Sequence, residues 1–215
     1  DFSLDVWELY DTTTDWTQAK NLADEQPEKL AELQRLFLIE AARHNVFPMD
    51  DRAAERMNPE IAGRPTLVKG DRLRLYPGMV RLGENVAINV KNRSFSVTSE
   101  VVVPDDGSLE GAIVAQGGRT GGWSFFAEDG KLGFHYNCCG LQRSTTLSDA
   151  AIGAGEHQVR VEFAYDGGKP GSGGMCRLSV DGKQVGAARV PRTMPFLYSA
   201  DEGVDVGMDN ETPVT

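Results

Sequence analysis

Four Asp-Gly dipeptides separate runs of alternating apolar and polar residues in the C-terminal half of the chain. They begin at Asp106, Asp129, Asp166 and Asp181. Asp-Gly between such runs is a strong hairpin signal, because both central residues of a type I′ turn need a positive φ angle. Short strands at regular spacing with such turns are typical of an antiparallel β-sandwich or jelly roll.

The alternating runs themselves predict strands. In Phe95–Val103 the odd-numbered positions are mostly apolar, and Val159, Val161 and Phe163 alternate with polar neighbours. Leu178 and Val180 repeat the pattern. Successive side chains of a strand point to opposite faces, so these segments each predict one buried and one solvated face.

The N-terminal part differs in pattern. Val6 to Asp11 alternates and predicts a short strand, and Pro27 opens a helix, since its fixed φ and missing N–H suit the first helical position. Apolar residues then recur at helical spacing and predict an amphipathic helix that needs a partner surface. The stripe comprises Leu30, Leu33, Phe37, Ala41 and His44, widened by Leu36 and Ile39.

We therefore divide the chain into three parts. Residues 1–47 form a strand and a helix, residues 48–85 form an ordered linker rich in Pro, Gly and charge, and residues 86–215 form a β-sandwich domain. The fold class is mainly β, a concanavalin-like jelly roll preceded by a short strand-helix segment.

Charge and length narrow the function classes. The 215 residues carry 22 Lys plus Arg and 32 Asp plus Glu, a net charge of −10. Phosphate binding depends on Lys and Arg, so this balance argues against nucleic acid or an anionic membrane surface as a partner. No apolar run in the sequence approaches the roughly 18 residues of a membrane-spanning helix. The chain begins at Asp1 without Met and stops at Thr215 without an obvious tail, so we expect a fragment of a longer protein.

The three cysteines, Cys138, Cys139 and Cys176, suit neither a disulfide framework nor a zinc site. We predict buried or half-buried free thiols, which favour a reducing, cytoplasmic compartment.

Few patterns point to catalysis. The sequence has no serine-hydrolase, zinc-protease or P-loop motif, and the Gly-rich run 117–122 predicts a flexible loop rather than a phosphate cradle. The histidines at 44, 135 and 157 are far apart and are predicted to be structural. Glu100 and Glu162 would serve a glycosidase only if they faced each other across a groove; more often such residues point to solvent.

An acidic run near the C-terminus supplies weak metal candidates. Asp201, Asp205 and Asp209, with Glu202 between them, offer the oxygen ligands that Ca²⁺ prefers. Their spacing lacks the tight alternation of a calcium loop, so the prediction for the chain is no metal and solvated acids.

Aromatic residues gather on neighbouring predicted strands. If exposed, Trp123, Tyr136 and Arg143 would make a platform for a sugar or aryl ligand. If buried, the same aromatic residues, with Phe125 and Phe134, would be sandwich core. Core is the favoured interpretation.

Several strings resemble one family. Trp7-Glu-Leu-Tyr-Asp-Thr, Asp15-Trp-Thr-Gln-Ala-Lys-Asn-Leu-Ala23 and Pro27-Glu-Lys-Leu-Ala-Glu-Leu33 are similar to the C-terminal signature of the sulfatase family. The rest is similar to the C-terminal extension of large bacterial arylsulfatases. The strings that carry this second likeness are Tyr76-Pro-Gly-Met79, Lys91-Asn-Arg-Ser94, Ala115-Gln-Gly-Gly118, Gly121-Gly-Trp123, Phe163-Ala-Tyr-Asp166 and Pro191-Arg-Thr-Met-Pro195.

The resemblance implies a parent enzyme that hydrolyses sulfate monoesters with a formylglycine and Ca²⁺. The formylglycine arises from Cys or Ser in C/S-x-P/A-x-R, and Gly140, Leu141 and Leu178 stand where this chain's cysteines would need Pro or Ala. The Ca²⁺ ligands of the family also lie upstream. The chain alone is therefore expected to be inactive and to hold no cofactor. Its partner would be the N-terminal catalytic domain of the same polypeptide.

Three hypotheses result. In the first, the chain is a non-catalytic C-terminal fragment of an arylsulfatase whose sandwich completes the fold, shapes substrate access or mediates self-association. In the second, it is a carbohydrate-binding module that uses Trp123, Tyr136 and Arg143 on a sulfated or other glycan. In the third, with least support, it is a sandwich glycosidase.

Overall fold

The computed structural model describes residues 5–49, 52, 56, 62–63 and 67–214. The chain divides into two compact units, Asp1–Ala53 and Ala54–Thr215. The boundary falls inside the segment 48–85 that the sequence assigns to a linker. Among the described residues, no helix is long and apolar enough to cross a membrane.

The first unit is built around one helix, α1 (Pro27–Arg43). Pro27 stands at its start, as the sequence predicts, and Glu28 lies in its first turn, where its charge complements the positive end of the helix. The strand predicted over Val6–Asp11 is absent, because these residues pair with no neighbouring strand in the described part of the unit. Instead, Leu9 bonds the loop before the helix: its N–H donates to Asn21 Oδ1 at 3.0 Å and its carbonyl accepts from Leu22 at 2.7 Å.

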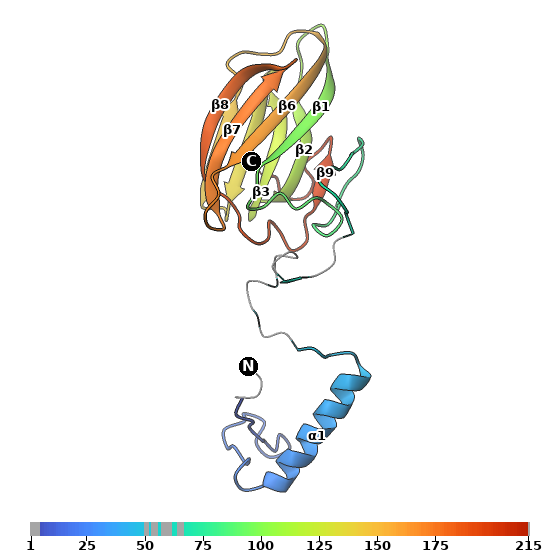
Figure 1. The fold of residues 1–215 in the computed structure, drawn as a ribbon, viewed down its shortest axis with the longest axis vertical. Coiled ribbons are helices and arrows are strands. Elements are labelled where there is room, and N and C mark those ends of the chain that lie inside the picture. The colour runs from blue at the N-terminus through green and yellow to red at the C-terminus, as the bar shows by residue number, and fades with distance from the viewer. Residues whose placement is uncertain (1–4, 50–51, 53–55, 57–61, 64–66, 215) are drawn as a thin grey trace. The chain divides into compact units, whose positions relative to one another are not determined.

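The second unit is a mainly β structure of two antiparallel sheets (Figure 1). One sheet has the order β1-β6-β7-β8 and the other the order β5-β4-β3-β2-β9. The strands are β1 (Phe95–Val103), β2 (Gly111–Gly118), β3 (Gly121–Glu128), β4 (Lys131–Cys138), β5 (Gln142–Leu147), β6 (Gly155–Tyr165), β7 (Ser172–Val180), β8 (Lys183–Arg192) and β9 (Val204–Val206).

Alternation explains how the sheets bury their inner faces. Along β1 the odd positions are half-buried or buried and the even positions exposed, as predicted. The core between the sheets is apolar, and its aromatic rings touch one another. Its largest fully buried side chains include Phe125, Leu132, Phe134 and Leu178.

Two of the four Asp-Gly dipeptides form the predicted hairpin turns. Asp129-Gly130 joins β3 to β4, Asp181-Gly182 joins β7 to β8, and all four residues have positive φ. Asp166-Gly167 starts a longer loop between β6 and β7. Asp106-Gly107 lies in the crossover from β1 to β2, which belong to different sheets, so no hairpin is possible there.

The Gly-rich run 117–122 is not the flexible loop that the sequence suggests. Gly117, Gly118, Gly121 and Gly122 belong to the paired ends of β2 and β3. A Cβ at Gly117 would lie 2.2 Å from the Gly121 carbonyl oxygen, so this tight strand end requires glycine.

Within the second unit, part of the segment before β1 is hydrogen-bonded to β9. Leu82 exchanges backbone hydrogen bonds with Val204, and Gly78 donates to Val206. The Lys91 ammonium, nearly fully buried, pairs with the Glu84 carboxylate and lies 4.9 Å from the centroid of the Tyr198 ring. Glu84 also accepts from the Tyr198 N–H at 2.7 Å.

Candidate functional site

The predicted aromatic platform is core. Trp123 and Tyr136 lie on the inner faces of β3 and β4 with only 4% and 2% of their surfaces exposed. Arg143 is exposed on β5, opposite Asn137 in the register and thus one residue out of phase with Tyr136. The three side chains therefore occupy opposite faces of one sheet and do not form a common ligand surface.

Trp123 nevertheless lines a cavity of about 1100 Å³. Its apolar wall includes Phe95 and Val97 of β1, Val114 of β2 and Val206 of β9. Gln116 is the buried polar side chain in this wall, and its Oε1 accepts a hydrogen bond from Trp123 Nε1 at 3.1 Å. Among the described residues that line the cavity there is no histidine or cysteine. Charged side chains also line the cavity, so the arrangement can enclose apolar groups beside charged ones. They are Asp71, Arg74, Arg93, Glu162 and Arg177.

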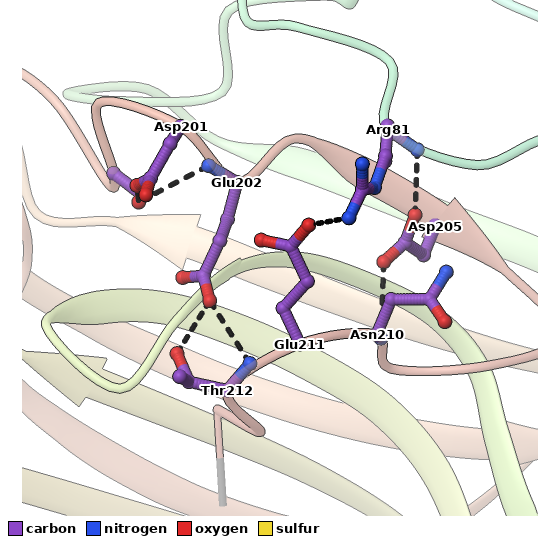
Figure 2. A network of polar contacts seen from close by, with 8 residues as sticks. Arg81, Asp201, Glu202, Asp205, Asn210, Glu211 and Thr212 are labelled. Atoms are coloured by element: carbon purple, nitrogen blue, oxygen red, sulfur yellow. Dashed lines mark hydrogen bonds and ion pairs between the residues drawn. The ribbon is translucent and has the colours of Figure 1, made fainter.

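The acidic run near the C-terminus binds backbone rather than converging on one point. Figure 2 shows Asp205 between two segments: its Oδ1 accepts from the Arg81 N–H at 2.7 Å and its Oδ2 from the Asn210 N–H at 3.1 Å. The Glu202 carboxylate accepts from both the N–H and the hydroxyl of Thr212. These carboxylates fasten the chain after β9 to its neighbours.

Of the remaining acids, two bind side chains and one binds backbone. Asp201 accepts from the Ser199 hydroxyl at 2.9 Å, and Glu211 pairs with the Arg81 guanidinium (Figure 2). Asp209 accepts from the Val214 N–H at 3.0 Å. Burial, with the charges of Asp205 and Glu202, raises the pKa of Asp209 above its usual value. Within the described ranges, no three His, Cys, Asp or Glu side chains form a group suited to a metal ion.

The two glutamates of the glycosidase hypothesis do not face each other. Glu100 lies opposite Gln158 and Glu162 opposite Ser96, so they are four residues apart in the register of β1 and β6. That offset is about 13 Å at the rise of a β-strand, beyond the roughly 5–9.5 Å that separates the carboxyls of glycosidases. Arg160, between them, pairs with Glu162 at 2.9 Å.

The histidines have structural contacts, as predicted. His44 ends α1 within 3.3 Å of Glu40. His135 is buried on β4, where its Nδ1 lies 2.7 Å from the Thr145 hydroxyl, and burial lowers its pKa. His157 Nδ1 lies 2.7 Å from the Asp181 carboxylate, which raises the pKa of the imidazole.

The cysteines are free, and their burial differs from one to the next. Cys176 is buried and Cys138 half-buried, whereas Cys139 is exposed, contrary to the prediction for it. Cys139 has a φ of 58° and sits at the tip of the hairpin between β4 and β5, where a turn residue cannot reach the core. Its sulfur lies 3.4 Å from the Met194 sulfur, a contact that no sequence signal announces because the two residues are 55 positions apart.

Several apolar side chains of the first unit are exposed. Leu36, Leu38 and Ile39 of α1 expose 49%, 54% and 62% of their surfaces, and Trp16 exposes 83%. Exposed apolar side chains that form a contiguous patch mark interaction sites.

Comparison with known proteins adds no relative. A scan against protein-family models finds no match, and a search of curated proteins finds none either.

Proposed function

We propose that the chain is the non-catalytic C-terminal region of an arylsulfatase, whose parent reaction is hydrolysis of a sulfate monoester. The proposal starts from the sulfatase-like strings at Trp7–Thr12, Asp15–Ala23 and Pro27–Leu33. The acids near the C-terminus are consistent with it, since Asp201, Asp205 and Asp209 bond separate partners within the chain.

The cofactors of the family do not fit the residues present. Cys176 is buried in the sheet core, and none of the cysteines has the Pro or Ala of the formylglycine motif two places on. Asp201, Asp205 and Asp209 are bonded to separate partners. The formylglycine and Ca²⁺ of the parent would therefore be held by its N-terminal catalytic domain, and no catalytic step is assigned to this chain.

The structural observation that carries the proposal is a set of exposed apolar side chains on the amphipathic helix α1. Phe37 faces the inside of its own unit, with ring centroids 5.5 Å from Trp7 and 6.4 Å from Phe47. Ile39 follows two residues later, which at 3.6 residues per turn puts it nearly on the opposite side of the helix. We assign Ile39 and the other exposed apolar side chains of α1, which lie among charged residues, to a contact with the catalytic domain.

The sandwich would complete the fold of the parent, shape access to its substrate or mediate self-association. We assign it the concanavalin-like jelly-roll type on the basis of its two antiparallel sheets of four and five strands. The alternative function, a carbohydrate-binding module, has weaker support, because Trp123 and Tyr136 are core residues and only Arg143 of the three is exposed.

Two experiments test the proposal. The reading frame upstream of the Asp1 codon should encode a C/S-x-P/A-x-R motif, and a start codon close to Asp1 would overturn the assignment. The purified chain should not hydrolyse an aryl sulfate, whereas the product of the whole reading frame should. Turnover by the chain alone at an enzymatic rate would also overturn it. Binding of the chain to a panel of sulfated glycans would favour the carbohydrate-binding alternative.

A further inference from the structure

Three sulfur atoms gather where the β4–β5 hairpin meets the segment after β8. Cys138 is the last residue of β4, Cys139 follows it in the turn, and Met194 comes two residues after β8. The Met194 sulfur lies 3.4 Å from the Cys139 sulfur and accepts the Cys139 N–H at 3.2 Å. Cys138 directly precedes Cys139 in the chain and, like Met194, packs against the sandwich core.

The fold holds this arrangement from both sides. The Met194 N–H donates to the Tyr136 hydroxyl at 2.9 Å, which ties its backbone to β4. Gly121 leaves room for the thioether, since a Cβ there would lie 2.9 Å from the Met194 methyl and 3.1 Å from its sulfur. In the turn, Cys139 and Gly140 both have positive φ, and the Leu141 N–H bonds back to the Cys138 carbonyl at 3.1 Å.

We propose that Cys138, Cys139 and Met194 form a binding site for one soft monovalent cation of the copper(I) and silver(I) class. Thiolate and thioether sulfurs are the ligands that select such ions, whereas Mg²⁺ and Ca²⁺ require oxygen. The site is separate from the acidic run and from the apolar cavity, and it does not depend on the proposed sulfatase role.

Charge and access are consistent with such a site. Each thiol loses its proton on binding, so two protons leave and the bound centre has a net charge of −1. Arg192 at the end of β8 acts electrostatically on Cys138 and would offset part of this charge. Cys139 is exposed and gives the ion an entry point.

The test uses silver(I), a redox-inert probe, added to the purified chain in chloride-free buffer. Native mass spectrometry should show one ion per chain with release of two protons. Cys139→Ser should abolish this complex. Since loss of even an outer-shell partner lowers metal affinity about 10- to 100-fold, Met194→Leu should weaken binding by at least about tenfold.

Met208→Leu is the matched control, because Met208 is an exposed thioether outside the cluster. It should bind silver(I) as the unchanged chain does. If Met194→Leu and Met208→Leu bound silver(I) with equal affinity, the proposed role of the Met194 thioether would be overturned. Unchanged binding by Cys139→Ser would overturn the site as a whole. Melting curves of each variant without metal show whether it has folded, and a Cys139→Ala variant replaces Cys139→Ser if the latter does not.

Discussion

At the scale of single residues, one ion pair of the second unit is buried. The Lys91 and Glu84 side chains are 1% and 11% exposed, and their ion pair also holds the Tyr198 N–H. Removing one partner of a buried pair costs about 3–5 kcal/mol, because the other charge stays buried without compensation. We predict that Lys91→Ala lowers the free energy of unfolding of the second unit by this amount in urea titrations.

The control for this prediction is the exposed pair of Arg160 and Glu162 in the same unit. Exposed ion pairs contribute at most about 1 kcal/mol, so Arg160→Ala should be nearly neutral. If Lys91→Ala and Arg160→Ala lowered the free energy of unfolding by similar amounts, Lys91 would be solvated rather than buried.

His157 makes the stability of the sandwich depend on pH. Its ring bonds Asp181 Oδ2 at 2.7 Å and the Gly153 carbonyl at 3.0 Å. Asp181, the larger influence, raises the pKa of His157, and His157 lowers the pKa of Asp181. A raised histidine pKa stabilises the fold fully below its unfolded value of about 6.5, and the contribution is lost as pH rises through the folded value.

For Asp181 the sign is opposite. Its contribution is present above the unfolded value of about 3.9 and is lost as pH falls through the lowered folded pKa. We therefore predict that the urea concentration at the unfolding midpoint decreases as the pH rises from about 5.5 to about 8.5, because the imidazole loses its proton in this range. His157→Asn should remove most of this decrease. An equal decrease in the variant would assign the pH dependence to other groups.

At the scale of elements, α1 has apolar side chains that pack within the first unit and others that are exposed. Phe37 packs inside the first unit, so Phe37→Ala should unfold the helix and lower the helical circular dichroism of the chain. Ile39 is 62% exposed, and Ile39→Lys should change stability by no more than about 0.5 kcal/mol. Ile39→Lys should also reduce binding of a hydrophobic dye. In the arylsulfatase that we propose as the parent, it should impair docking of this unit on the catalytic domain.

These two variants are controls for each other because they lie two residues apart on one helix. Loss of helix in Ile39→Lys would mean that the outer side is already packed within the chain. The sulfatase assignment would then lose its principal structural support.

At the scale of the whole molecule, the two units differ in how much core each contains. The apolar core described above lies within the sandwich, whereas Leu9 and Ala41 are the only buried apolar residues among the described positions of the first unit. We predict that residues 54–215 alone melt at the temperature of the full chain. Circular dichroism measures this, and a clear drop in the melting temperature of 54–215 would contradict the prediction.

Local pattern was a good guide to the elements. Phe95–Val103 alternates and forms β1 with the predicted bounds, and Pro27 begins the helix as its geometry requires. Val6–Asp11 alternates too but forms no strand, since a strand also requires a hydrogen-bonding partner and the pattern contains no information about one.

The sequence by itself determined the mainly β class, the helix and the absence of known catalytic motifs, because periodicity and turn chemistry act between near neighbours. Only the tertiary structure decided which side chains share an environment. Trp123 and Tyr136 lie in the core, the Asp205 carboxylate accepts backbone hydrogen bonds, and Met194 contacts Cys139, which is 55 residues away in the sequence. The physical reason is that sheet order and crossovers set these contacts, and they depend on packing over the whole domain rather than on any local run of residues.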